Sequence, residues 1–153
     1  MANTYTQLQI HAVFAPRFRD AVIHPSWEED LYRYLTGAVQ GQGHKMLQVN
    51  GMPDHVHCLI GMHPKQSVMD LLKTTKEESS RWINKNDLVR GRFAWQPGYG
   101  AFSVDKRGVP AVATYIQLQK VHHQKMDFRS EYRKLLKKAE VEYDERYIFR
   151  DLE

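Results

Sequence analysis

Cysteine and long apolar stretches are both scarce in this chain of 153 residues. Because Cys58 is its one cysteine, the sequence can form neither an intrachain disulfide framework nor a multi-cysteine zinc site. No apolar run approaches the roughly 20 residues of a membrane-spanning helix, and residues 1–6 lack the basic and then apolar order of an export signal. Internal repeats and low-complexity segments are also absent. These absences predict a single cytoplasmic domain that is not attached to a membrane.

Charge is distributed unevenly near the C-terminus, although 22 Lys and Arg against 18 Asp and Glu leave a net charge of only +4. Residues 120–138 hold seven basic and two acidic side chains, whereas residues 139–153 hold two basic and six acidic ones. The basic stretch suits a nucleic-acid partner and the acidic stretch a second subunit, but two solvated helix faces would give the same pattern. The side chains that we single out for such a partner are Lys120, Lys125 and Arg129 in this stretch, and Arg107 before it.

The predicted elements follow the order strand, helix, strand, strand, helix, strand. Helical spacing predicts one helix that begins at Ser26, with a capping box to Glu29, and a second helix capped by Ser67. Alternation of apolar and polar residues, together with turn residues, predicts strands at 5–14, 45–50, 55–62 and 99–104. This order is that of an α+β, ferredoxin-like βαββαβ fold, in which the first and third strands form the middle of an antiparallel sheet.

A third helix, from Pro110 through about Lys125, follows the six elements of that pattern. The stretch 105–108 that connects it to the sheet is polar and contains glycine, so the helix can dock on its own domain or on a neighbouring one. We therefore describe residues 1–153 as a single domain. Its parts are a core at 4–105, a helix at about 109–126 and a C-terminal tail at 127–153.

Two histidines on the predicted third strand face the same way. Strand alternation places His55 and His57 on one face and Cys58 on the other. Two neutral imidazoles side by side are a metal-binding pair, because each offers one ring nitrogen to an ion and the other to a supporting partner. In a chain with eight histidines the triplet alone is a weak signal, and two exposed histidines on a sheet would look the same.

Tyr115 and Gln119 are four residues apart on the predicted third helix, so they share a face at about 6 Å along its axis. A phenol with a pKa of about 10 is a poor nucleophile near neutral pH. An ion held by the two histidines and the Gln119 oxygen could polarise a phosphodiester that Tyr115 attacks. A tyrosine in a core or an interface has the same pattern. His122 and His123, which follow on this helix, could support the metal ligands from outside, but we expect them to be a solvated pair.

Three segments together resemble the HUH single-tyrosine transposases of small bacterial insertion sequences, the insertion sequence 200/605 group. They are residues 51–57 (Gly-Met-Pro-Asp-His-Val-His), the aromatic stretch 95–104, and Tyr115 with Gln119, so the resemblance spans nearly the whole chain. It implies that His55, His57 and Gln119 hold a magnesium or manganese ion (Mg²⁺ or Mn²⁺). It also implies that Tyr115 is the nucleophile that becomes joined to a DNA 5′-phosphate, with a 3′-hydroxyl as the leaving group.

The same resemblance implies a homodimer that moves single-stranded DNA and recognises hairpins near the ends of a mobile element. In such a dimer the tyrosine helix of each subunit completes the partner's active site in trans, and the protein would associate with the nucleoid when bound to DNA. Two alternatives stay open. One is a domesticated relative that processes chromosomal hairpin repeats by identical chemistry. The other is a non-enzymatic RNA-binding module, which would need aromatic residues on the exposed sheet face, where the first strand offers Gln7, Gln9 and His11.

Overall fold

The computed structural model describes residues 3–17 and 22–148, and its centre is a four-stranded antiparallel sheet with the order β2-β3-β1-β4. The strands are β1 (Leu8–Phe14), β2 (Lys45–Met52), β3 (His55–Met62) and β4 (Gly100–Val104). Helix α1 (Pro25–Gly41) lies between β1 and β2 in the chain, and α2 (Val68–Lys85) lies between β3 and β4. This arrangement confirms the expected α+β, ferredoxin-like fold with β1 and β3 in the middle.

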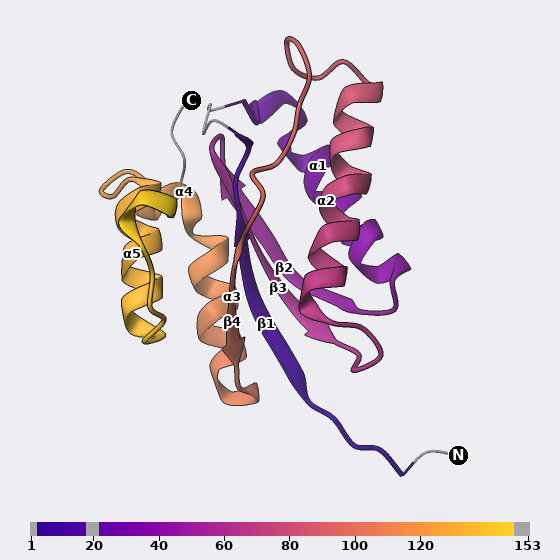
Figure 1. Cartoon of the computed structure of the whole chain (residues 1–153), viewed down its shortest axis with the longest axis vertical. Coiled ribbons are helices and arrows are strands. Elements are labelled where there is room, and N and C mark those ends of the chain that lie inside the picture. Colours follow the sequence, from indigo (N-terminus) through magenta and orange to yellow (C-terminus); the bar gives the residue numbers. More distant parts are fainter. Residues whose placement is uncertain (1–2, 18–21, 149–153) are drawn as a thin grey trace.

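Helices α1 and α2 cover one face of the sheet (Figure 1). Successive side chains of a strand point to opposite faces, so alternate residues of the central strands meet these helices. The resulting apolar core is the larger of two and includes Ile10, Ala12, Phe14, Val56, Cys58 and Ile60 from the strands and Leu31, Leu35, Leu71, Leu72 and Ile83 from the helices.

The opposite face is covered by α3 (Val109–Gln117), α4 (Gln119–His122) and α5 (Phe128–Lys138), which Figure 1 shows on the other side of the sheet. A smaller apolar cluster lies beneath α5 and is made of Val13, Ala15, Phe128, Tyr132, Leu136 and Ile148. Because of this second layer, His11, His55 and His57 are buried. The open sheet surface that an RNA-binding module would use is therefore absent over these strands in the described residues.

The predicted third helix is two helices, because the chain leaves helical geometry at Leu118 (φ −93°, ψ 18°). The Asn50 side chain donates hydrogen bonds to the carbonyls of Ile116 and Gln117, at 3.1 and 3.0 Å. In a continuous helix those two carbonyls would accept from backbone amides four residues later. The short η2 turn (Lys106–Gly108) precedes α3, and Asp105 caps it through the Gly108 amide at 2.8 Å.

Two helix starts differ in how well the sequence predicted them. Ser67 caps α2 as expected, accepting a hydrogen bond from the Asp70 amide at 3.0 Å. The Ser26 cap was wrong, since His24 caps α1 and its Nδ1 accepts from the Ser26 amide at 3.0 Å. Pro25 fits the first helical position because it has no amide hydrogen to satisfy.

The strand bounds also differ from the prediction at two ends. β1 begins at Leu8 rather than at residue 5, and β2 continues to Met52, which pairs with His55. The turn between β2 and β3 is therefore shorter than the predicted four residues. No helix in the described part of the chain has the length and apolar character that crossing a membrane requires. Residues 149–153 of the predicted acidic tail lie outside the described residues.

Candidate active site

His55 and His57 lie next to each other along the buried face of β3. Neither side chain is exposed to solvent. Their strand is central, pairing with β1 on one side and β2 on the other, so the backbone beneath them is held from both directions. The alternation that the sequence predicted therefore brings the two imidazoles together on one face.

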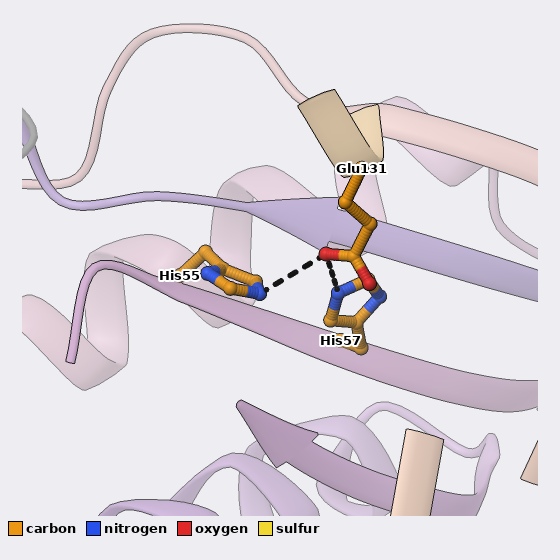
Figure 2. A group of neighbouring side chains, drawn as sticks. All are labelled: His55, His57 and Glu131. Atoms are coloured by element: carbon orange, nitrogen blue, oxygen red, sulfur yellow. Dashed lines mark hydrogen bonds and ion pairs between the residues drawn. The ribbon is translucent and has the colours of Figure 1, made fainter. Parts of the chain in front are cut away.

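Glu131 reaches both imidazoles from α5, one of the helices that cover this face of the sheet (Figure 2). Its Oε1 lies 3.1 Å from His57 Nε2 and 3.3 Å from His55 Nε2, and the carboxylate is buried. One ligand atom from each of the three residues lies within 4.8 Å of the others, so this group could hold a metal ion. Two imidazole nitrogens and a carboxylate oxygen form a donor set that fits a divalent cation.

Tyr115 and Gln119 converge on the same carboxylate. The Tyr115 hydroxyl donates a short hydrogen bond to Glu131 Oε2, and Gln119 Nε2 donates to that oxygen at 2.8 Å. Gln119 Oε1 lies 3.0 Å from His55 Nε2, which places the amide oxygen beside the three-residue donor set. The structure thus brings together all four of the residues that the sequence singled out for catalysis and metal binding.

Each imidazole has a supporting partner on its second nitrogen. His55 Nδ1 lies 2.7 Å from Asp54 Oδ1, and His57 Nδ1 lies 2.7 Å from His11 Nε2. Such partners fix the orientation and tautomer of a metal-binding histidine. With Asp54 as acceptor, His55 carries its proton on Nδ1, which leaves Nε2 available as a ligand atom.

The surroundings set the charge of the cluster. Burial would raise the pKa of Glu131, but hydrogen bonds from His123, His55 and His57 outweigh it and hold that pKa far below its usual range. Burial lowers the pKa of His57 to about 4. Burial also lowers the pKa of His55, but hydrogen bonds to Asp54 and Glu131 raise it above the usual value.

Tyr115 remains a neutral phenol in these surroundings. Burial, and then the hydrogen bond to Glu131, raise the pKa of its hydroxyl. Its ring stacks on His122, with centroids 4.7 Å apart. His123 also belongs to the site, since its Nε2 lies 2.9 Å from Glu131 Oε1. The expectation of a solvated His122 and His123 was therefore wrong, because both are half-buried: His122 packs on Tyr115, and the His123 ring lies 4.6 Å from that of His55.

The basic residues expected to contact DNA occupy different environments. Lys120 is held by its own chain, because its ammonium lies 3.2 Å from Glu28 and donates to the Gly51 carbonyl. Arg107 and Lys125 are exposed, and Arg129 is half-buried. Lys120 thus anchors α4 to the β2–β3 hairpin and to α1, while Arg107 and Lys125 remain accessible.

Glu131 is the functional residue that the sequence analysis missed. It was counted as one of two acids within a basic stretch, and its stretch was assigned to a tail. A signal was nevertheless present. Phe128, Glu131, Tyr132 and Leu135 recur at helical spacing, which places a carboxylate within an apolar helix face, where a buried charge needs partners.

A family model and two relatives of known name all place this chain in the same family. The model of the family described as "Transposase IS200 like" matches residues 4–119. The ISDra2 transposase TnpA of Deinococcus radiodurans is 25% identical over 118 residues, which cover 74% of this chain and 84% of that protein. The transposase for insertion sequence element IS200 of Salmonella typhimurium is 27% identical over 124 residues, covering 78% and 81%.

Two solved structures share the fold. The crystal structure of a transposase candidate from Deinococcus radiodurans has a TM-score of 0.62 and 23% identity, covering 78% of this chain and 95% of that one. A REP-associated tyrosine transposase bound to a REP hairpin has a TM-score of 0.60 and 13% identity, covering 80% and 73%.

Proposed function

Since the chain belongs to the IS200-like transposase family, we propose that it cleaves and rejoins single-stranded DNA with Tyr115 as the nucleophile. One observation carries this proposal. The Tyr115 hydroxyl is hydrogen-bonded to the same Glu131 carboxylate that contacts His55 and His57, so a nucleophile and a metal-binding donor set meet at one point.

The proposed reaction is a transesterification. The Tyr115 oxygen forms a bond to phosphorus, the bond from phosphorus to the upstream 3′-oxygen breaks, and that oxygen leaves as a 3′-hydroxyl after taking up a proton. Tyr115 gives up its proton to solvent water as it attacks, and the departing 3′-oxygen takes a proton from water in return. Glu131 orients the hydroxyl for this step. The products are a 5′-phosphotyrosine and a free 3′-hydroxyl, and attack by a 3′-hydroxyl reverses the step and rejoins the strand.

The donor set assigns the residues that would hold a cation, namely His55, His57 and Glu131, with the Gln119 oxygen beside them. A divalent cation at such a site polarises the phosphate and stabilises the charge that develops on its oxygens. We propose Mg²⁺ or Mn²⁺. A carboxylate among the ligands suits either ion, and imidazole ligands favour Mn²⁺ over Mg²⁺.

The DNA partner and the assembly form a further part of this proposal. The similar REP-associated transposase is bound to a hairpin, and the family resemblance implies hairpin ends and a homodimer with active sites completed in trans. Exchange of α3 between subunits is compatible with its light packing, since Ile116 is its one buried residue among those described. Within the single chain, Tyr115 contacts Glu131 of the same chain.

Replacement of the nucleophile tests the proposal. The substitution Tyr115→Phe removes only the reacting oxygen, so we expect covalent protein–DNA adducts to disappear while hairpin binding is retained. Adducts are measured on denaturing gels with 5′-labelled and 3′-labelled single-stranded DNA from the flanks of the gene. Tyr99→Phe is the matched control, because Tyr99 is partly exposed and absent from the cluster. An adduct formed by Tyr115→Phe would overturn the assignment and direct attention to Tyr99 or Tyr132.

A further inference from the structure

A pocket opens beside Tyr115, between the edge strand β4 and helices α3 and α5. Its volume is about 630 Å³, within the roughly 300–1,000 Å³ typical of small-molecule sites. Tyr115, Glu131 and His11 form part of its wall. The pocket therefore gives access from solvent to a cluster whose histidines are otherwise buried.

The remaining wall combines an apolar surface with two cations. The apolar residues are Phe102, Val104, Ala111, Val112, Met126, Leu135 and Ala139. The cations are Lys134 and Lys138, four residues apart on α5, and both are exposed. An apolar wall beside fixed positive charge matches a nucleotide, whose base is flat and weakly polar and whose phosphate is anionic.

We propose that this pocket receives one unstacked base of single-stranded DNA, belonging to a nucleotide next to the phosphate that Tyr115 attacks. The inference rests on the proposed function and adds a binding subsite to it. The base packs against Phe102 and Val112, while Lys134 and Lys138 meet neighbouring phosphates. Proteins that bind single-stranded nucleic acid combine positive charge along the backbone with aromatic side chains on which bases stack.

Position supports a base in this pocket over a sugar or a phosphate alone. The Phe102 ring lies on the pocket wall and meets His11 edge to face, with centroids 6.1 Å apart. His11 in turn contacts His57, so only Phe102 and His11 would separate the base from a proposed metal ligand. The apolar wall offers phosphate no donors of its own, whereas the two lysines do.

The test compares two probes that carry the same number of phosphates: a short oligothymidylate and an abasic oligomer of equal length, both labelled with fluorescein. Fluorescence anisotropy gives their dissociation constants. We expect the wild-type protein to bind oligothymidylate about tenfold more tightly than the abasic oligomer, the size of one base–aromatic contact. Equal affinities for the two probes would overturn the proposal.

Two variants with matched controls locate the base. Ala111→Trp fills the pocket, so the preference for oligothymidylate should disappear, whereas Thr114→Trp adds the same group to α3 outside the pocket and should keep it. The double variant Lys134→Glu and Lys138→Glu should lower the affinity for both probes alike. Its effect should be larger than that of Lys137→Glu, because Lys137 lies on the same helix outside the pocket. A preference that survives in Ala111→Trp, or an equal effect of Lys137→Glu, would contradict the assignment.

Failure of this inference can be told apart from failure of the proposed function. Base preference is a binding measurement that requires no cleavage, whereas adduct formation depends on the Tyr115 oxygen. If adducts form and no base preference exists, the pocket is wrong and the chemistry stands. Thermal unfolding of Ala111→Trp checks its fold, and the lysine variants, which alter only exposed side chains, test the pocket independently.

Discussion

Glu131 connects three parts of the molecule through its two carboxylate oxygens. Oε1 contacts the histidines of β3 and His123 of the segment after α4, and Oε2 accepts from Tyr115 on α3. A buried carboxylate without such partners would cost several kcal/mol. The residues that would act on DNA are therefore also the residues that make burial of this charge possible.

Metal binding should be visible as stabilisation of the fold. A ligand at 100 times its dissociation constant adds about 2.7 kcal/mol to the free energy of unfolding. We expect Mn²⁺ to raise the thermal midpoint of the wild-type protein, and His57→Ala and Glu131→Ala to abolish this rise. Chelator should remove it, and adding Mn²⁺ back should restore it. Differential scanning fluorimetry with and without Mn²⁺ measures the shift.

His44→Ala is the control for losing a buried histidine, because His44 contacts Gln66 and the His63 amide outside the cluster. It should lower the midpoint but keep the rise with Mn²⁺. The same experiment on Gln119→Ala tests whether the amide oxygen is itself a ligand. If Mn²⁺ raised the thermal midpoint of His57→Ala as much as that of the wild type, the site would be refuted. A protein that unfolds on chelation would indicate a structural metal.

At the scale of elements, α5 is both a lid on the sheet and a source of site residues. Phe128 stacks on His55, with ring centroids 3.8 Å apart, and Tyr132 and Leu136 pack in the second apolar cluster. Gly100 on β4 makes room for this helix, since a Cβ atom there would lie 2.7 Å from Tyr132. The inner face of α5 thus supplies both the packing on the sheet and the Glu131 carboxylate of the site.

The β2–β3 hairpin that carries both histidines depends on one glycine. A Cβ atom on Gly51 would lie 2.2 Å from the His55 carbonyl oxygen, a backbone atom that cannot move without shifting β3. We expect Gly51→Ala to lower the free energy of unfolding by about 1–3 kcal/mol, the usual cost of overpacking. Urea denaturation followed by circular dichroism measures it.

Gly37→Ala is the matched comparison, because nothing lies within 4 Å of a Cβ atom at this position of α1. Alanine in a helix interior should raise the free energy of unfolding by roughly 0.5–1 kcal/mol. If both substitutions changed stability by the same amount and sign, the close approach of the two strands would not be what constrains Gly51.

Across the whole molecule, the two faces of the sheet differ in function. Helices α1 and α2 cover one face, and α3, α4 and α5 cover the other (Figure 1). The α1 and α2 face holds the larger apolar core, whereas the other face holds the histidines and the pocket. DNA approaching the second face would meet Arg107, Lys125, Lys134 and Lys138. Under the proposed function, the first layer supplies stability and the second layer meets the DNA.

Binding to stem-loop DNA should depend strongly on salt. Phosphate contacts release counterions, so we expect affinity to fall roughly tenfold or more between about 50 and 200 mM salt. Lys125→Glu should weaken binding and reduce the salt slope, whereas Lys85→Glu, on the α1 and α2 side, should have little effect. Lys120→Glu is less informative, since it would also break the contact with Glu28. Affinity that does not change with salt would contradict an electrostatic interface, and tighter binding of plain duplex would contradict hairpin recognition.

Complementation tests the proposed exchange of α3 between subunits. In a mixed dimer of Tyr115→Phe and His57→Ala, exchange leaves one site with both lesions and one with none. We expect adducts to return, on the subunit that carries His57→Ala. A mixed dimer, confirmed by mass, that forms no adduct would show that each Tyr115 serves its own chain, and the chemistry would stand.

The sequence by itself predicted the sheet and its order, and it placed His55 with His57, and Tyr115 with Gln119, on shared faces. These two pairings follow from local periodicity: alternation of two along a strand, and a spacing of four along a helix. That the two pairs meet was implied only by the family resemblance. The capping of α1 by His24 and the break at Leu118 were not predictable in this way, because each depends on a hydrogen bond that competes with the simpler pattern.

Only the tertiary structure decided that Glu131 belongs to the site and that the histidine face is covered. Glu131 lies 74 positions from His57 in the chain, and their contact exists because α5 buries Phe128, Tyr132 and Leu136 against the sheet. No local pattern encodes where an amphipathic helix docks, since many faces of a protein offer apolar area. Which side chains surround the buried carboxylate is therefore decided by that packing.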